Sequence, residues 1–452
     1  MQPASDAVDP LAAVRQRSYV RLLVLAALVG IPISAAAYWF LYLVDRMQTW
    51  VFHDLPDALG VGTRSAWWPL VPLTVAGLLV ALAIKYLPGT GGHKPADGFQ
   101  TGPPVLPKEL PGIFFAALAT LALGAVLGPE APLIALGSGL ASSVALAMRR
   151  DVPATALAVI AAAGSFAAIS TLLGSPILGA FLLMEASGLG GALLDVALLP
   201  GLLAAGVGSL VFLGLDSWTG YGTFSLVIPN LPHFGTPDVA EFAWALGIGV
   251  AAALLGSAIR WLGLAAKRHI EPRVLLLTPV AGLLVGGLAG LYVVVTGKTS
   301  ADVLFSGQSD LPVLLTHGAE YSAAVLVMLV ACKGLAYGAS LGGFRGGPVF
   351  PAMFLGAAGG MALSHLPGLP LVAGAAAGIG AMCAVMLKLP LTSVLLATLL
   401  LGSDGVAVMP LVIVAVVVAY VLATRMVRPP EPAPTDPTPA SEHDEPVVAR
   451  GR

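Results

Sequence analysis

The chain has 452 residues, of which 57% are hydrophobic and only 10% are charged, with a formal net charge of −2 at pH 7. About a quarter of the residues in a typical soluble domain are charged. This composition, with a mean hydropathy of +0.91, therefore excludes an ordinary soluble protein and predicts a polytopic integral membrane protein.

Apolar runs with few charges follow one another along most of the chain. A helix that crosses a bilayer needs about 20 apolar residues, and several runs reach that length. Runs 154–184 and 389–424 are long enough to hold more than one helix each. In chain order the runs are 22–44, 68–84, 112–128, 131–147, 154–184, 192–215, 242–259, 274–296, 321–332, 348–364, 369–387 and 389–424.

Two polar segments flank the predicted membrane domain, residues 20–425. Residues 1–19 are predicted to form a cytoplasmic N-terminal segment, and residues 426–452, rich in Pro, Glu, Asp, Thr and Ser, a disordered cytoplasmic tail. Clusters of positive residues beside apolar runs mark cytoplasmic loops, so both termini are expected on the cytoplasmic side of the cell membrane. The clusters are Arg15, Arg17 and Arg21; Arg149 and Arg150; Lys267, Arg268 and Arg273; Arg425 and Arg428.

A five-residue motif occurs twice, each time at the start of an apolar stretch. Residues 128–132 read GPEAP and residues 347–351 read GPVFP. A Gly-Pro break that starts a helix leaves several backbone N–H groups without intrahelical partners, and the helix dipole places positive charge there. Two such starts could face one site and attract an anion. Glu130 would be a negative charge built into that site, and the alternative is a helix-capping glutamate at the membrane edge.

Two further landmarks recur in the same order. Residues 161–164 (AAAG) match residues 375–378, and Pro176 matches Pro390. The chain is therefore predicted to contain a duplicated unit, with halves at about 68–215 and 274–424. Hydropathy leaves open whether the halves are parallel or inverted. Glycine and proline breaks inside apolar runs also favour a transporter, because spanning helices tolerate them only where protein or a cavity satisfies the backbone.

Three other features are candidates for function. Glu185 ends an apolar run and is a proton-transfer candidate, or equally a glutamate at the membrane interface. The glycine-rich loop 88–95 can form an anion-binding nest, to which His93 and Lys94 add positive charge. Lys333 is the only charge between Glu320 and Arg345 and has no assigned role.

At these residues the chain resembles the CLC family of chloride channels and proton-coupled anion exchangers. Residues 128–132 resemble the family motif G-[KR]-E-G-P, residues 91–95 resemble G-S-G-I-P, and residues 347–351 resemble G-x-F-x-P. The resemblance implies an all-α fold of many tilted and re-entrant helices in two inverted halves, and a homodimer with one anion pathway per subunit. It assigns the gating role to Glu130, whose carboxylate occupies an anion position until protonation lets it swing aside. The resulting anion-binding candidates are Gly91, Gly92, His93, Gly128, Pro129, Ala131, Gly347, Val349 and Phe350.

The chain departs from the family pattern at four places. The filter serine aligns with Gly92, and Val349 or Phe350 takes the place of the third motif's phenylalanine. The tyrosine near the end of the last helix has no match, since Tyr420 lies too early. The exchanger's internal proton glutamate aligns with Ala186, beside Glu185. These differences bear on which anion is preferred and on proton coupling.

The sequence thus predicts anion transport, with chloride as the expected ion, through a pathway gated by Glu130. The alternatives are a proton-coupled exchanger of chloride or another small anion, and a secondary transporter of other solutes. Enzymatic activity is not expected, because Ser138 and Ser142 have no nearby histidine or lysine to activate them. We also expect no metal, cofactor or nucleic-acid partner; the expected partners are a small inorganic anion, protons in the exchanger alternative, membrane lipid and a second copy of the chain.

Overall fold

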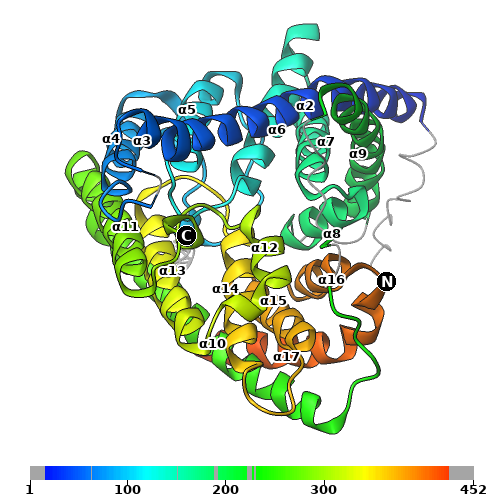
Figure 1. The fold of residues 1–452 in the computed structure, drawn as a ribbon. Helices are drawn as coiled ribbons and strands as arrows, with labels where there is room; N and C mark the ends of the chain where they lie inside the picture. Colours follow the sequence, from blue (N-terminus) through cyan, green and yellow to red (C-terminus); the bar gives the residue numbers. More distant parts are fainter. Residues whose placement is uncertain are drawn as a thin grey trace, which may run out of the picture.

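A computed structural model describes residues 16–62, 64–149, 151–187, 192–220, 227–228 and 231–426. Within these ranges the regular elements are helices, joined by short turns and one isolated β-bridge. Figure 1 shows α2 to α9 and α10 to α17 as two groups of helices that lie side by side. The predicted all-α class is confirmed.

The helices follow the apolar runs, with breaks where glycine or proline interrupts them. The two longest runs each split into two helices, as their length suggested. Gly174, in the left-handed conformation, ends α7 just before Pro176 starts α8. The principal helices are α2 (Arg17–Thr49), α3 (Leu55–Ala58), α4 (Leu70–Tyr86), α5 (Leu110–Ala122), α6 (Glu130–Met148), α7 (Ala154–Leu173), α8 (Pro176–Ser187), α9 (Ala192–Thr219), α10 (Val239–Ile270), α11 (Val274–Thr296), α12 (Asp310–Thr316), α13 (Ala323–Gly343), α14 (Val349–Leu363), α15 (Leu371–Leu387), α16 (Pro390–Leu400) and α17 (Gly405–Met426).

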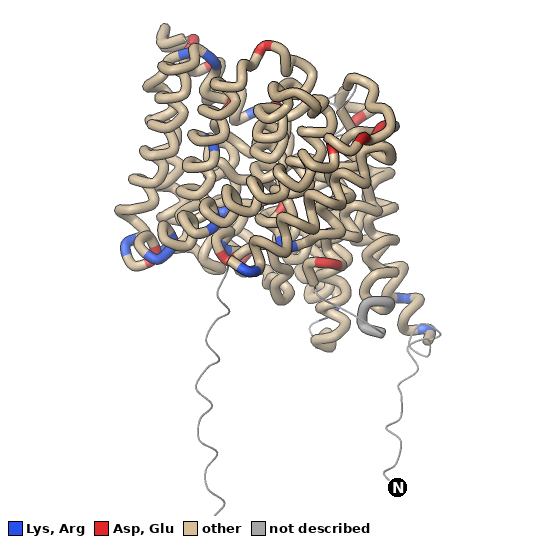
Figure 2. Tube along the Cα trace, turned by 90° about the horizontal axis from the view of Figure 1, so that it is seen from below, with Lys and Arg blue, Asp and Glu red and all other residues tan. Residues whose placement is uncertain are grey.

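The distribution of charge matches a protein that crosses a membrane several times. Seven helical stretches in the described part of the chain are long and apolar enough to span a bilayer. Figure 2 shows most charged residues along two opposite edges of the molecule, with a broad band between them that is largely uncharged. Shorter apolar helices, including α8, α14 and α16, lie among the long ones. The chain is a multi-pass membrane protein.

The two groups of helices repeat one packing pattern. In the first, α6 packs on α7, α7 on α9, and α9 on α2; in the second, α14 packs on α15, α15 on α17, and α17 on α10. Two of these contacts, α6 on α7 and α14 on α15, are close because glycines meet at equivalent positions in the two groups. A methyl group on Gly137 would collide with the backbone carbonyl of Gly164, and one on Gly356 with that of Gly378. Close helix approach through small residues is a common device in membranes.

The limits of the repeat halves remain a proposal. The predicted N-terminal segment lies largely outside the described residues, and its residues 17–19 form the start of α2. Of the predicted tail, only Met426 is described, as the last residue of α17.

Candidate anion site at two helix openings

The two copies of the repeated motif meet in space. The N–H of Gly128 donates to the carbonyl of Gly347 at 2.7 Å, and the N–H of Gly347 donates to the carbonyl of Gly128 at 2.6 Å. This antiparallel bridge places the starts of α6 and α14 against each other. The residues before the two helices share one backbone conformation, with φ −81° and ψ −2° at Pro129 and φ −93° and ψ −5° at Pro348. The N-termini of α6 and α14 therefore face each other, and the chain segments that lead into them run antiparallel.

The side chain of Glu130 lies between these openings and is fully buried. Its Oε1 accepts a hydrogen bond of 2.8 Å from the N–H of Phe350, in the first turn of α14. The backbone N–H groups of Glu130 and Val349 also lie close to the carboxylate. First-turn N–H groups have no intrahelical acceptor, so they are free to bind an anion or a carboxylate.

The charge of this carboxylate is only partly compensated by protein. Its Oε2 is buried and has no hydrogen-bond partner among the described residues. No lysine, arginine or histidine of the described chain lies within 4.0 Å of it. Within the described residues, backbone amides and helix dipoles are therefore what would stabilise a negative charge on this carboxylate.

Two glycines make room for the carboxylate. A methyl group on Gly347 would overlap Oε2 of Glu130, and one on Gly128 would overlap both carboxylate oxygens. Neither glycine has a positive φ. The requirement for glycine here is therefore close approach to Glu130 rather than backbone conformation.

A tyrosine that the sequence analysis missed contacts the start of α14 next to this site. The hydroxyl of Tyr337, on α13, is fully buried and donates to the carbonyl of Pro348 at 2.8 Å. Tyr337 is also within electrostatic range of Glu130. A phenol therefore fixes the first turn of α14, in a chain that lacks the family tyrosine near its end. Its only signal in the sequence is its place eleven residues before Pro348.

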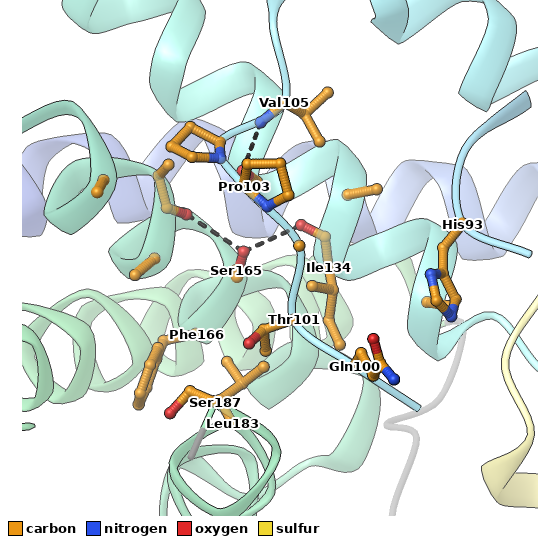
Figure 3. Close-up of a pocket in the computed structure, with 18 of the residues that line it drawn as sticks. His93, Gln100, Thr101, Pro103, Val105, Ile134, Ser165, Phe166, Leu183 and Ser187 are labelled. Carbon is orange, nitrogen blue, oxygen red and sulfur yellow. Dashed lines mark hydrogen bonds between the residues drawn. The ribbon is translucent and has the colours of Figure 1, made fainter. Parts of the chain in front are cut away.

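The loop of residues 88–95, which carries the first of the three family motifs in chain order (91–95) and is called the first-motif loop below, lies beside the helix openings. Gly92 and His93 line a cavity of about 850 Å³ together with Ala131, the residue that follows Glu130 (Figure 3). His93 Nε2 lies 2.6 Å from the carbonyl of Gly98, within its own loop. Gly91 is buried and does not line this cavity. The structure thus brings the first motif close to the second, while Gly92 offers no side chain in place of the family serine.

The same cavity reaches α8. Met184 and Ser187, on either side of Glu185, are among its lining residues, and so are Ser138 and Ser165 (Figure 3). The hydroxyl of Ser165, on α7, donates to the carbonyl of Ile134, on the neighbouring helix α6, at 3.1 Å. Most of the remaining lining is apolar.

Glu185 itself binds the start of α16, in the other half of the chain. Its carboxylate accepts from the N–H of Leu391 at 2.9 Å and from the N–H and hydroxyl of Thr392 at 2.7 and 2.6 Å. These bonds cap the N-terminus of α16, although Glu185 and Thr392 are more than 200 residues apart in the sequence. The structure therefore gives Glu185 a capping contact, and its part in proton transfer remains a proposal.

Lys333 contacts neither Glu130 nor Glu185. Its ammonium is fully buried and donates to the carbonyls of Asp302, Val303 and Leu304 at 3.0, 3.2 and 2.9 Å. It also lies 4.3 Å from the ring centre of Phe354 on α14. Lys333 thus ties the segment before α12 to the helix whose first turn faces Glu130.

Nothing in the described part of the chain gathers three His, Cys, Asp or Glu side chains that could hold a metal ion. The candidate site consists of backbone amides, one carboxylate and the three motifs around them. That arrangement suits a small anion, because amides bind it without a full opposite charge.

Comparison with known proteins identifies the family of this chain. Residues 96–424 match the family described as voltage gated chloride channel. The chain belongs to this family. Proteins named "Putative ion-transport protein YfeO" are its relatives. The one from Escherichia fergusonii is 29% identical over 376 residues, covering 82% of this chain and 84% of the relative. The one from Salmonella newport is 30% identical over 379 residues, covering 82% and 86%.

Solved structures of the CLC type share the fold. A slow cyanobacterial Cl⁻/H⁺ antiporter aligns with a TM-score of 0.72 at 18% identity, covering 90% of this chain and 95% of the other. A CLC-type fluoride/proton antiporter aligns with a TM-score of 0.67 at 19% identity, covering 90% and 96%. The predicted family and CLC-type fold are confirmed.

Proposed function

We propose that this CLC family member carries a small inorganic anion across the cell membrane, with chloride as the expected ion, between the openings of α6 and α14. The observation that supports this most strongly is the backbone cradle around Glu130. Amides and helix dipoles stabilise a negative charge there without a cation, so a bound ion can leave as well as enter. The family to which the chain belongs supports the same activity.

In this proposal the Glu130 carboxylate is the gate. It occupies the position that an anion would take, and its Oε1 uses the N–H of Phe350 that an anion would need. Protonation removes the negative charge that the amides hold. The neutral side chain then leaves the cradle more readily, and an anion replaces it.

Flux in liposomes tests the gate. Purified protein is reconstituted, and efflux of chloride, nitrate and fluoride is measured between pH 4.5 and 7.5. Wild-type flux should rise as pH falls, whereas Glu130→Gln should lose most of the pH dependence because its side chain cannot ionise. The exposed Glu320→Gln serves as control and should keep the wild-type profile. A Glu130→Gln variant with an unchanged pH profile would remove Glu130 from the gate.

Proton-coupled exchange is the second candidate. One observation favours it: a single cavity is lined both by Ala131, next to the gate, and by Met184 and Ser187, next to Glu185. The antiporters that share the fold are named for chloride/proton and fluoride/proton exchange. In an exchanger, an imposed chloride gradient should drive protons uphill in liposomes, and Glu185→Gln should weaken that coupling. Proton movement that never exceeds leakage would leave a passive channel.

Three further parts of the proposal concern the whole protein. We expect a homodimer with one pathway per subunit, both termini on the cytoplasmic side, and no enzymatic activity. The exposed apolar residues of α9, α16 and α17 supply surfaces for lipid and for a second copy; examples are Leu210, Leu391 and Val417.

A further inference from the structure

We propose that the guanidinium of Arg345 is the fixed positive charge of the anion pathway, acting where Gly92 offers no side chain. This rests on the proposed function of anion transport and adds a residue to it. The sequence places Arg345 two residues before the motif at 347–351, and no lysine or arginine follows it until Lys388.

The first argument is position, since the Arg345 side chain contacts the loop that carries the motif at 91–95, and Arg345 lies two residues before Gly347. Its Nε donates to the carbonyl of Thr90 in the first-motif loop at 3.2 Å, and its Cγ lies 3.3 Å from where a methyl group on Gly91 would be. Its backbone N–H donates at 3.2 Å to the hydroxyl of Thr120, near the end of the helix that leads to Gly128. Two residues later, Gly347 forms the bridge to Gly128.

The second argument is burial without a counter-charge. Arg345 is only 6% exposed, and its side-chain hydrogen bonds go to two neutral carbonyls, those of Thr90 and Phe344. No carboxylate of the described chain lies within 4.0 Å of it. A buried charge is costly unless an opposite charge compensates it. A transported anion would supply that compensation.

The two carboxylates that interact electrostatically with Arg345 each form a salt bridge with a lysine. Glu271 and Asp97 influence it over longer distances. Glu271 pairs with Lys94 at 2.6 Å, and Asp97 pairs with Lys267. The five side chains together carry three positive and two negative charges, so the cluster keeps an excess positive charge beside the first-motif loop.

A purely structural role makes a different prediction. If Arg345 only clamps the loop through the Thr90 and Phe344 carbonyls, its fork of donors matters and its charge does not. Lysine keeps the charge but lacks the fork. The Arg345→Lys and Arg345→Gln variants therefore separate the two roles.

Calorimetric titration of the full-length protein in detergent with chloride and with nitrate tests the proposal, in gluconate buffer at low ionic strength to limit screening. Arg345→Gln should weaken Kd by about 10- to 100-fold, as expected for losing a hydrogen bond to a charged group. Arg345→Lys should recover most of that loss. Glu271→Gln, which removes a negative charge near Arg345 and frees Lys94, should tighten binding.

An unchanged Kd in folded Arg345→Gln would overturn the proposal, and so would Arg345→Lys binding as weakly as Arg345→Gln. Should Arg345→Gln fail to fold, an unchanged Kd in Glu271→Gln would overturn it instead. Absence of anion binding and flux in the wild type would contradict the proposed function itself. Wild-type binding with no effect of charge at Arg345 would contradict only this inference.

Discussion

At the scale of single residues, the site depends on two glycines, because their lack of a side chain leaves room for the Glu130 carboxylate. The Glu130 carboxylate fills the space that a side chain on Gly347 would need. The carboxylate accepts a hydrogen bond from the first turn of α14, and it can do so only because the backbone of α14 approaches it closely. Val349 stands in the motif copy at 347–351 where the copy at 128–132 has Glu130, so one carboxylate serves both helix openings.

Gly347→Ala should displace the carboxylate, because the new methyl group would occupy the position of Oε2. We expect anion flux at neutral pH to rise toward that of Glu130→Gln and the pH dependence to flatten. Gly359→Ala, on the same helix, is the matched control, since its methyl group would meet no atom within 4 Å. Wild-type flux and pH dependence in Gly347→Ala would show that the carboxylate does not close the pathway from this position.

At the scale of elements, α13 contacts α14 at two points. The Tyr337 hydroxyl fixes the first turn of α14, and the Lys333 ammonium lies against the ring of Phe354 one turn further along. Lys333 also holds the carbonyls of residues 302–304. Asp302, in this segment between α11 and α12, accepts a hydrogen bond of 3.0 Å from the Tyr292 hydroxyl.

Burial raises the pKa of Asp302 from 3.8 to about 6, against the opposing effects of the Tyr292 hydroxyl and Lys333. The folded protein therefore binds this proton more tightly than the unfolded chain does. The resulting stability is fully present below pH 3.8 and is lost as pH rises through about 6. The loss amounts to at most about 3 kcal/mol.

Asp302→Asn should therefore flatten the fall in unfolding free energy between about pH 4 and pH 6, because asparagine does not titrate. Part of the slope should remain, since burial also raises the pKa of Asp310. Thermal or denaturant unfolding in detergent measures the effect, with the exposed Glu320→Gln as control. An identical slope in wild type and Asp302→Asn would show that folding does not change the protonation of Asp302 in this pH range.

At the scale of the whole molecule, local and repeated signals predicted the fold well. The apolar runs correspond to the helices. The repeated motif forms the bridge of Gly128 with Gly347, the AAAG glycines Gly164 and Gly378 lie against Gly137 and Gly356, and Pro176 and Pro390 start α8 and α16. The family resemblance supplied the inverted orientation of the halves, which hydropathy alone left open.

What the sequence did not predict depends on contacts between distant segments. The bond of Tyr337 to Pro348, the three carbonyls around Lys333 and the contact of Glu185 with Thr392 arise only when helices pack. Arg345 served only to bound the stretch that contains Lys333, although its place two residues before Gly347 was a usable signal. Charges inside apolar regions are the residues whose partners sequence patterns identify least well.

The central claim is that the two helix openings form an anion site that Glu130 fills when no ion is bound. Anomalous X-ray scattering from crystals of Glu130→Ala grown in bromide tests it most directly. We predict a bromide peak at the position that the Glu130 carboxylate occupies in the wild type, within hydrogen-bonding distance of the Phe350 N–H, and no peak there in wild-type crystals at high pH. Ordered bromide elsewhere in Glu130→Ala, with none beside Phe350, would contradict the account.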